Sequence, residues 1–512
     1  MTSRFYVTTP IYYVNGAPHI GHAYTSVAAD VLARFHRLSG HEVFFLTGTD
    51  EHGQKVEQAA QNAGIAPQLF TDRISADFRD MADVMAISYD DFIRTTEPRH
   101  IKSAQALWQK VAENGAIYSG AYEGWYALRD ECFYGEDELV TGADGVKTAP
   151  TGAPVEWVKE PSYFFKLSEY QDRLLELYEK NPEFLGPNST RREIISFVKH
   201  GLRDLSISRT SFKWGVPVPG DEDHVMYVWF DALANYLSAL DYPDMSAEKA
   251  AFWPASLHLV GKDIARFHAV YWPAFLMAAG IELPEKIFAN GWWTVEGQKM
   301  SKSLGNVVDP RELVKEFGLD SVRFFLLREV PFGGDSDLSR KSMIMRNNIE
   351  LANDLGNLCQ RTLALVARNC GGVVPERRVL TDEDKQLLGQ ASLLPQLLSD
   401  RMAACALTDA LEDVWKVIRA GNAYIDHQAP WALRKTDEER MKDVLRVLLD
   451  TLRSIATVLQ PFMPQSMEKM LVQLGVNEDE RSFAALEVLL PAGRSLPAPQ
   501  GIFPRYVEQE AG

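Results

Sequence analysis

The chain has 512 residues, of which 46% are hydrophobic and 24% are charged. These proportions are typical of soluble globular proteins and exclude a disordered, collagen-like or disulfide-stapled chain. The 53 Lys and Arg against 70 Asp and Glu give a net charge of −17. That charge argues against indiscriminate binding of polyanions but permits one local basic surface. Because one hydrophobic core seldom organises so long a chain, we expect two or three domains.

The four cysteines are scattered and form no C-x-x-C pair: Cys132, Cys359, Cys370 and Cys405. This spacing predicts neither a disulfide framework nor a cysteine-bound metal. The first residues lead into a strand-like segment without the apolar core of a signal peptide, and no apolar run is long enough to span a bilayer. We therefore expect a soluble cytoplasmic enzyme.

The first fifty residues predict a β-α-β unit. Arg4 to Thr9 is a strand-like run, and apolar residues at spacings of three and four after Gly21 predict a helix that ends near Gly40. Glu42 to Thr47 then reads as a buried strand. A strand, a crossover helix and a second strand imply a parallel sheet, which binds ligands beyond the carboxyl ends of its strands.

The pattern of residues in the remaining chain changes twice. Helical patterns continue to about residue 115, and residues 116–204 then show short strand-like pieces, aromatics and turns that suggest an insertion. The runs Tyr227 to Phe230 and Leu257 to Val260 predict that parallel strands return. Later segments predict long amphipathic helices joined by short loops, as in an antiparallel bundle. Those helices are expected over 349–366, 387–399, 407–425 and 441–459.

A first motif with chemical potential is Pro18-His19-Ile20-Gly21-His22, which follows the first strand. Two imidazoles there could contact a phosphate above the helix N-terminus, where backbone N–H groups favour anions. The glycine between them lets the backbone approach closely. The alternative is a pair of histidines that merely cap the helix or lie on the surface.

A second motif is Lys299-Met300-Ser301-Lys302-Ser303, followed by Leu304-Gly305-Asn306. Two lysines on a short loop could neutralise the charge that develops on a leaving pyrophosphate, a task of positioning and electrostatics. As an isolated pentapeptide it could equally be a solvated loop.

Together these motifs are the two signatures of class I aminoacyl-tRNA synthetases, and the chain resembles the bacterial methionyl-tRNA synthetase family over nearly its whole length. The segments that carry the resemblance are Thr9–Gly16, Thr47–Gly53, Tyr227–Ala232, Gly261–Ile264 and Asn290–Ser303. The resemblance implies that ATP and L-methionine form methionyl-adenylate and pyrophosphate. The methionyl group would then pass to the 3′-terminal adenosine of initiator and elongator tRNA(Met). The alternatives are a nucleotide- or tRNA-binding paralogue without catalysis, and a class I synthetase for another amino acid.

The resemblance also implies a role for individual residues. Charge in the transition state would be stabilised by His19, His22, Lys299 and Lys302. ATP, with Mg²⁺, would be bound by Asn15, Gly16, His19, Gly21, His22, Gly261, Lys262, Asp263 and Lys302. The methionine pocket would be formed by Ile11, Tyr13, Trp229, Ala232, Leu233, Tyr236, Ile264, His268 and Trp272. Asp50 would bind the substrate ammonium, and Arg209 would lie near the substrate carboxylate and phosphate.

The residues themselves support a pocket for a thioether. Two apolar stripes at helical spacing run from Trp229 to Tyr236 and from Ile264 to Trp272. Both stripes could simply be core, but the polar atoms of His268 and Tyr236 would then need partners. Aromatic rings also make favourable contacts with methionine sulfur. For Asp50 the alternative is a helix N-cap, and for Arg209 it is a surface ion pair.

The helical C-terminal half is expected to recognise the CAU anticodon. Its opening segment, 340–368, holds five basic and two acidic residues, a local charge of +3 that suits an RNA backbone. Asn357 and Arg361 lie four residues apart, and Pro430-Trp431 offers an indole that could stack on a splayed base. The alternatives are an ordinary helix-surface pair for Asn357 and Arg361, and bundle core for Trp431.

The insertion departs from the family pattern at a structural zinc site. Ala127 and Asp130 stand where many relatives carry the first ligand pair, and Thr148 and Thr151 stand at the second. Zinc requires four convergent N or S ligands, so we predict a metal-free knuckle held by packing alone.

These observations combine into an α/β fold with a Rossmann-like, doubly wound parallel-sheet catalytic domain and an all-α anticodon-binding bundle. The expected boundaries are 1–115 and 205–290 for the two catalytic halves, 116–204 for the inserted connective domain, 291–340 for the lysine-loop and stem-contact region, 341–480 for the bundle and 481–512 for a tail that packs back on the body. We expect a monomer without membrane contact or an obligate protein partner.

Overall fold

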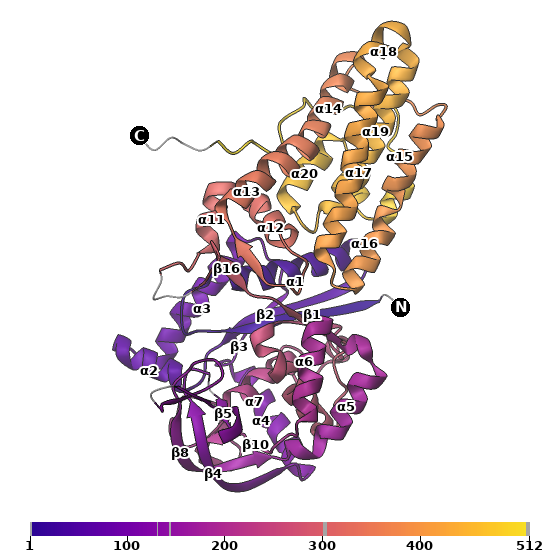
Figure 1. The fold of residues 1–512 in the computed structure, drawn as a ribbon. Helices are drawn as coiled ribbons and strands as arrows, with labels where there is room; N and C mark the ends of the chain where they lie inside the picture. Colours follow the sequence, from indigo (N-terminus) through magenta and orange to yellow (C-terminus); the bar gives the residue numbers. More distant parts are fainter. Residues whose placement is uncertain (1–2, 131, 143–144, 301–304, 508–512) are drawn as a thin grey trace.

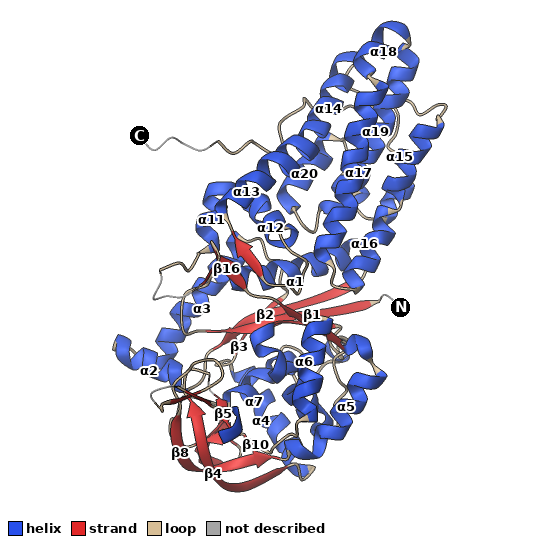
Figure 2. Cartoon of the chain, in the orientation of Figure 1, coloured by secondary structure: helices blue, strands red, loops and turns tan. Residues whose placement is uncertain are grey.

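The computed structural model describes residues 3–130, 132–142, 145–300 and 305–507. An α/β part with two prominent sheets occupies one end of the molecule, and a long bundle of helices extends from it (Figure 1). Figure 2 shows that strands are concentrated in the α/β part. None of the described helices is both long and apolar enough to cross a membrane.

The central sheet has six strands, all parallel, in the order β3-β2-β1-β14-β15-β9. The strands are β1 (Arg4–Tyr13), β2 (Glu42–Asp50), β3 (Asp91–Arg94), β9 (Leu185–Gly186), β14 (Leu257–Gly261) and β15 (Ile287–Asn290). From β1 the chain builds towards β2 and β3 on one side, whereas β14 and β15 lie on the other. The strand order therefore reverses between β1 and β14, where open α/β sheets bind their ligands. The predicted doubly wound sheet is confirmed.

Helices cover this sheet on both faces and position its strand ends. They include α1 (Ile20–Leu38), α2 (Gln54–Ala63), α3 (Pro67–Val84), α4 (Pro98–Glu113) and α10 (Trp272–Ala279). The predicted β-α-β unit is confirmed: α1 buries Val27, Val31 and Phe35 in the core below the sheet. Apolar side chains at this spacing form one continuous helix face.

The predicted strand at Tyr227–Phe230 is wrong, because this run begins α7 (Val228–Leu233), which α8 (Asn235–Ser238) follows. A short apolar run fits a buried helix as well as a buried strand. The strands nearby are instead antiparallel, in the order β11 (Ser208–Arg209), β13 (Asp221–Met226) and β12 (Pro217–Val218). Trp229, Asp231 and Ala232 therefore lie on the short helix α7.

The segment 116–204 begins in a separate antiparallel sheet and ends beside the central parallel sheet. Its sheet has the order β10 (Leu205–Ser206), β8 (Glu156–Phe165), β4 (Ile117–Ala127) and β5 (Cys132–Tyr134). The small strands β6 (Val140–Thr141) and β7 (Lys147–Thr148) pair with each other. After α5 (Gln171–Lys180) the chain adds β9 to the edge of the central sheet, and α6 (Asn188–Lys199) follows.

The segment after β15 joins the two parts of the molecule. It contains β16 (Trp293–Val295), β17 (Gln298–Lys299), α11 (Pro310–Phe317), α12 (Leu319–Arg328) and β18 (Ser336–Leu338). The fully buried Arg323 of α12 donates to Asp30 of α1 at 2.7 Å and to the carbonyls of Pro461 and Phe462 at 2.8 and 3.0 Å. One guanidinium thus ties α1, which starts at the histidine motif, to the helical bundle.

The bundle is formed by α13 (Arg340–Arg346), α14 (Asn357–Asn369), α15 (Asp382–Ser392), α16 (Leu394–Ala403), α17 (Leu407–Gln428), α18 (Pro430–Thr436), α19 (Glu438–Leu459) and α20 (Pro464–Gln473). The helix expected over 349–366 starts as π-helix at Asn347–Gly356. The helix expected over 387–399 breaks at Leu393, because Pro395 lacks the N–H that would continue α15. The tail returns to the segment that joins the two parts, where Tyr506 stacks on Phe317 of α11 with ring centroids 4.9 Å apart.

Candidate active site

The histidine motif lies at the carboxyl end of β1 and begins α1. His19 is the N-cap residue of α1, and its Nδ1 accepts from the backbone N–H of Gly21 at 3.1 Å. Nδ1 of His22 accepts from the backbone N–H of His19 at 3.2 Å. A Cβ on Gly21 would lie 3.0 Å from the His19 ring, so only glycine fits there without displacement. The exposed Asn15 and the partly buried Gly16 form the turn before the motif.

Both imidazoles are neutral in this arrangement. Each Nδ1 accepts a hydrogen bond, so each ring carries its proton on Nε2. The rings stack with their centroids 3.8 Å apart, a separation at which two cations would repel each other. Burial and the adjacent His19 lower the pKa of His22 well below its usual value. The capping alternative is correct for Nδ1, and the Nε2–H groups remain donors for a phosphate above the helix N-terminus.

The turn after β14 carries the next group of predicted ATP-binding residues. Gly261 ends the strand, and Lys262 and Asp263 start a short 3₁₀ turn. The ammonium of Lys262 lies 2.6 Å from Asp335 and 3.9 Å from the ring centre of Trp292. Nε1 of Trp292 in turn donates to Asp263 at 3.3 Å. This turn lies beside β1, where the strand order of the sheet reverses, and Lys262 is ion-paired with Asp335.

The structure describes only part of the lysine motif. Lys299 lies in β17, paired with Thr294, but its side chain lies outside the described residues, as does Lys302 with the whole of 301–304. After these residues the chain passes the start of α1, where the backbone N–H of Ile20 donates to the carbonyl of Val308 at 3.0 Å. The segment that leaves the motif therefore reaches the histidine pair.

Four of the predicted methionine-site residues form a connected wall. The hydroxyl of Tyr236 donates to Nε2 of His268 at 2.7 Å, and Nδ1 of His268 donates to the carbonyl of Ile264 at 3.0 Å. Burial lowers the pKa of His268 to about 4, so its ring is neutral near pH 7. The indole N–H of Trp272 donates to His258 at 3.3 Å. The polar atoms in the apolar stripe thus have partners.

The other predicted wall residues come from β1 and α7. Ile11 and Tyr13 are partly buried near the end of β1, and Tyr13 pairs in register with Asp50. Trp229 stacks on Phe267 with ring centroids 3.9 Å apart. Ala232, Leu233, Tyr236 and Trp272 are almost fully buried. A ligand that contacts them therefore requires these side chains to move.

The N-cap alternative for Asp50 is wrong, and the ion-pair alternative for Arg209 is wrong in its location, because Nε of Arg209 lies 3.9 Å from the buried Glu160. Asp50 ends β2 and is 7% exposed, whereas the N-cap of α2 is Gly53. Arg209 is 3% exposed rather than on the surface. Its guanidinium donates to Ser206 at 2.9 Å and lies 4.8 Å from the ring centre of Tyr227, next to α7.

Sequence reasoning missed a buried polar cluster behind this site. Asp231 lies between His52 and His100, and all three side chains are buried. The available signal was an acidic residue inside the apolar run Val228–Leu233, which needs a partner when buried. The identity of the partners could not be read from the sequence, because they come from two other segments.

The predicted anticodon residues gather at the far end of the bundle. Trp431 lies in the first turn of α18 and is 47% exposed, so the core alternative is wrong. The guanidinium of Arg361 lies 5.4 Å from the Trp431 ring centre and donates to Asp426 at 2.6 Å. Asn357 is exposed one turn earlier on α14, and Pro430 is buried at the start of α18.

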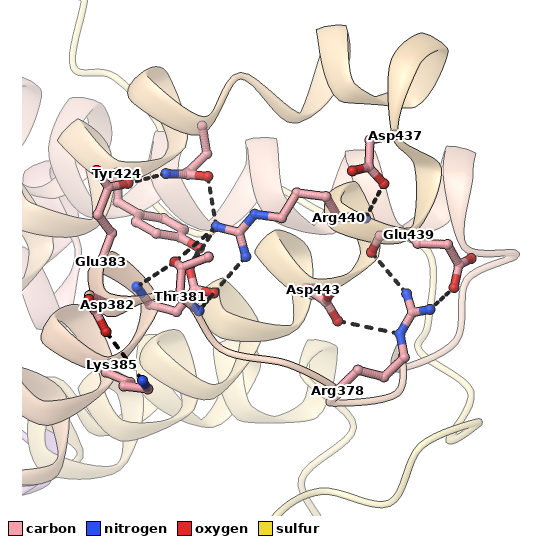
Figure 3. Close-up of polar contacts among 12 residues, drawn as sticks. Arg378, Thr381, Asp382, Glu383, Lys385, Tyr424, Asp437, Glu439, Arg440 and Asp443 are labelled. Atoms are coloured by element: carbon pink, nitrogen blue, oxygen red, sulfur yellow. Dashed lines mark hydrogen bonds and ion pairs between the residues drawn. The ribbon is translucent and has the colours of Figure 1, made fainter.

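A polar network fixes the corner that carries α18 (Figure 3). Arg440 of α19 donates to both oxygens of the buried Asp384, at 2.5 and 2.8 Å, and to Gln428 at the end of α17, at 2.7 Å. The hydroxyl of Tyr424 donates to Asp384 at 2.5 Å. Burial disfavours the charged carboxyl, but Arg440 and Tyr424 outweigh it and keep the pKa of Asp384 at about 2. Helices α15, α17 and α19 are thereby joined around the base of α18.

The knuckle in the insertion is held by more than packing, so that prediction is wrong in part. A small apolar cluster contains Ala127, Cys132, Tyr134, Ala149 and Ala153. In addition, Asp130 accepts hydrogen bonds from the hydroxyl of Thr151 and, at 3.1 Å, from that of Tyr134. Thr148 donates to the carbonyl of Val140 at 3.3 Å. In the described parts of the chain, no group of three or more His, Cys, Asp or Glu side chains is arranged to hold a metal ion.

A parallel sheet with a histidine pair at its switch point and a helical bundle after it defines the class, the class I aminoacyl-tRNA synthetases. The family described as "tRNA synthetases class I (M)" matches residues 5–363, and the "Anticodon binding domain of methionyl tRNA ligase" matches residues 374–511. The chain belongs to the methionyl-tRNA synthetase family.

Individual relatives agree along the whole chain. The methionine–tRNA ligase of Rickettsia felis is 58% identical, covering 99% of each chain, and that of Mesorhizobium japonicum is 55% identical, covering 99% of this chain and 98% of the relative. The solved Mycobacterium tuberculosis methionyl-tRNA synthetase in complex with methionyl-adenylate superposes with a TM-score of 0.96 at 49% identity, covering 98% of this chain and all of the other. Its apo form gives 0.90 at 46% identity, covering 99% of each.

Proposed function

We propose that this chain is a methionine–tRNA ligase, which activates L-methionine with ATP and charges initiator and elongator tRNA(Met). The observation that carries the proposal is the pair of neutral, stacked imidazoles at the N-terminus of α1, at the switch point of the sheet. They offer two N–H donors where the helix dipole already favours a phosphate. The whole-chain similarity to methionine–tRNA ligases supports the same activity.

In the first step, a carboxylate oxygen of methionine attacks the α-phosphorus of ATP. A new P–O bond forms, the bond to the β-phosphate oxygen breaks, and pyrophosphate leaves with the electron pair of the broken bond. His19 and His22 would donate hydrogen bonds to oxygens whose charge grows in the transition state. Lys302, assisted by Lys299, would neutralise the leaving pyrophosphate. Catalysis then rests on positioned donors and charges, without a side-chain nucleophile.

In the second step, a hydroxyl of the terminal adenosine of tRNA attacks the methionyl carbonyl. The ester bond to the tRNA forms, the bond to AMP breaks, and the hydroxyl proton leaves with AMP or passes to water. The anticodon would be read far from this chemistry, at the end of the bundle. Asn357 and Arg361 would contact base edges, while Pro430 presents the Trp431 indole for stacking.

The roles around the amino acid are those that the family resemblance implies. Asp50 would bind the ammonium of methionine, and Arg209 would lie on the side of its carboxylate. The wall from Tyr236 to Trp272 would hold the thioether once its side chains move. Gly261, Lys262 and Asp263 would meet the adenosine ribose. Lys262 must then exchange or share its contact with Asp335 when ATP binds.

Mg²⁺ would enter with ATP rather than occupy a dedicated protein site. Magnesium commonly binds substrate phosphates and keeps several waters, with one or two carboxylates at most. In the knuckle, Asp130, Thr148 and Thr151 offer only oxygen atoms, which do not match the N and S ligands of structural zinc. Absence of structural zinc, a monomeric state and a cytoplasmic location stay predictions.

The test is ATP–pyrophosphate exchange with methionine, set against leucine, isoleucine and cysteine. We expect exchange with methionine alone, followed by charging of tRNA(Met). Exchange with another amino acid would favour a different class I synthetase. Absence of exchange with every amino acid, despite binding of nucleotide or tRNA, would favour a paralogue without catalysis.

A further inference from the structure

A fully buried carboxylate, Asp231, lies between two imidazoles beside the predicted methionine pocket. Its Oδ2 is 2.7 Å from Nδ1 of His52, and its Oδ1 is 2.6 Å from Nε2 of His100. His52 belongs to the loop after β2, His100 to α4 and Asp231 to α7. One carboxylate therefore joins three segments that are far apart in the sequence.

The hydrogen bonds of Asp231 require one N–H on each imidazole. A carboxylate only accepts, so Nδ1 of His52 and Nε2 of His100 must both carry N–H. Nδ1 of His100 is 3.1 Å from the hydroxyl of Ser238, which also lies 2.8 Å from the carbonyl of Ala234. Both nitrogens of His100 therefore have a polar partner. Burial opposes ionisation of Asp231, but the two histidines outweigh it and hold its pKa at about 2.

The Asp231–His52 hydrogen bond connects the two sides of the predicted amino-acid site. His52 is two residues beyond Asp50, the expected ligand of the substrate ammonium. Asp231 lies in α7 between Trp229 and Ala232, which are expected to contact the thioether. Only residues 51–53 separate β2 from α2, so the Asp50 backbone has little freedom once His52 is bound.

A second set of contacts restrains the same strand end from the opposite direction. The buried Glu51 accepts from Arg94 at 2.7 and 3.0 Å and from Thr96 at 2.6 Å. The indole N–H of Trp214 donates to the Glu51 carbonyl at 2.6 Å. The contact of His52 with Asp231 then links this restrained strand end to α7.

We propose that Asp231 is a positioning residue for methionine recognition. With His52 and His100, it sets the separation between the Asp50 carboxylate and the α7 side chains that contact the thioether. The inference rests on the proposed function, because both sides are assigned through methionine binding. Apart from Lys302, the expected ATP contacts arise near the ends of β1 and β14, and none of them belongs to α7 or to the loop after β2. Loss of the carboxylate therefore weakens binding of methionine and spares that of ATP.

The direct test is Asp231→Asn, assayed by ATP–pyrophosphate exchange. The amide keeps the side-chain shape but removes the charge and offers one donor and one acceptor, so one imidazole must change its tautomer or lose a buried hydrogen bond. We expect the KM for methionine to rise about tenfold, while the KM for ATP changes by less than about threefold. Calorimetric titration with methionine alone should show the same loss of affinity.

A pair of variants at His52 separates positioning from general stability. His52→Asn keeps a donor at the position of Nδ1 and should stay within about threefold of the wild-type KM for methionine, whereas His52→Leu removes the donor and should resemble Asp231→Asn. Asp30→Asn is the matched control, since Asp30 is equally buried and ion-paired but lies on α1. It should lower the melting temperature without changing the KM for methionine.

The outcomes are distinguishable. Equal increases in the KM for methionine and for ATP would overturn the inference, and so would a folded Asp231→Asn enzyme with wild-type methionine affinity. If Asp231→Asn does not fold, the His52 pair decides: equal KM values in His52→Asn and His52→Leu would overturn it. A wild-type enzyme without methionine-dependent exchange would contradict the proposed function itself.

Discussion

The two ends of the molecule neutralise a buried carboxylate in different ways. Near the amino-acid pocket, Asp231 is paired with two imidazoles. At the far end of the bundle, Asp384 is paired with the guanidinium of Arg440 and the hydroxyl of Tyr424 (Figure 3). Imidazole changes charge near neutral pH, whereas guanidinium stays charged throughout. Because the α/β part also holds most of the histidines, we expect it to respond to acid in a way that the bundle does not.

The distribution of histidines extends this contrast to the whole chain. Ten of the eleven histidines precede residue 269, and only His427 follows. Burial lowers the pKa of His22, His36, His258 and His268, so these rings are neutral in the folded protein. His427 in the bundle is exposed. The histidine pair of the proposed mechanism and most of the histidines thus share one part of the molecule, whereas the bundle holds its buried Asp384 with an arginine.

The largest effect is expected for His22→Ala in the α/β part. Removing one preorganised donor to a developing charge should lower the rate of ATP–pyrophosphate exchange about 100- to 1000-fold. Binding of tRNA, measured by filter retention, should stay unchanged because the anticodon residues lie in the bundle. His200→Ala is the control, since His200 is exposed on α6 and should retain full exchange. A modest effect of His22→Ala would remove the histidine pair from the mechanism.

The next effect tests the arginine-based network in the bundle. Asp384→Asn leaves Arg440 partly buried without its carboxylate partner, which should lower the free energy of unfolding by about 3 kcal/mol. Urea unfolding followed by circular dichroism measures this change. Asp382→Asn, on the same helix, breaks only the surface pair with Lys385 and should change stability by less than about 1 kcal/mol. Methionine-dependent exchange should survive both substitutions, and its loss would contradict the separation of the two parts.

Acidification should distinguish the two parts in the wild-type protein. The pKa of His268 is lowered to about 4, so its folded-state ring stays neutral while the unfolded-state ring binds a proton below about pH 6.5. Its contribution to stability is complete above that pH and falls as the pH drops towards 4. The loss amounts to at most about 3 kcal/mol. Calorimetric melting curves should show destabilisation of the α/β part first. His268→Gln should make the melting temperature depend less steeply on pH.

Asp231 and Asp384 also make the folded protein less stable as the pH falls, but for the opposite reason. Folding favours the charged form of these carboxyls, whereas it favours the neutral form of His268. The pKa of each carboxyl is lowered to about 2, so the stability that each provides is complete above its ordinary pKa near 4 and is lost as the pH falls from there to about 2. Between pH 6.5 and 4 the two carboxylates therefore do not make the free energy of unfolding depend on pH. Simultaneous destabilisation of the bundle over that range would contradict the histidine-based explanation.

Local sequence patterns predicted much of the fold. The strand, helix and strand of the first fifty residues were correct, because each run is long enough to show its period. The strand predicted at Tyr227–Phe230 failed, since a short apolar run does not separate helix from strand. The π-helical turns at 347–356 shift hydrogen bonds by one residue and leave no sequence pattern.

Some residues of the candidate site can likewise be predicted from a local sequence pattern, and others cannot because their partners are far away in the sequence. The place of His19 and His22 follows from one β-α junction, which the sequence displays directly. The partners of Asp231 come from residues 52 and 100, so their meeting depends on how α4 and α7 pack. Likewise Arg440 finds Asp384 across more than fifty residues of chain. Such contacts are products of tertiary packing, and periodicity carries no information about them.

A smaller effect is expected at the surface of the bundle. Trp431→Ala removes a base-stacking platform, which should lower kcat/KM for charging tRNA(Met) about tenfold. ATP–pyrophosphate exchange should be unchanged, because the substitution lies at the opposite end from the histidine pair. Trp157→Ala is the control, since Trp157 is 52% exposed on β8 in the insertion. Loss of exchange in Trp431→Ala would mean that this indole supports the catalytic part directly.

The last prediction is that a chelator has no effect on the stability of the protein. It decides whether acid destabilises the α/β part by protonating histidines or by releasing a metal. Release of a structural metal at low pH would also destabilise the α/β part. The knuckle instead relies on Asp130 with Thr151 and on a small apolar cluster, so a chelator such as EDTA should leave the melting temperature unchanged. Atomic emission should find no stoichiometric zinc in the purified protein. If EDTA lowered the melting temperature as acid does, the acid sensitivity of the α/β part would belong to a metal site, and the contrast between imidazole and guanidinium would lose its main support.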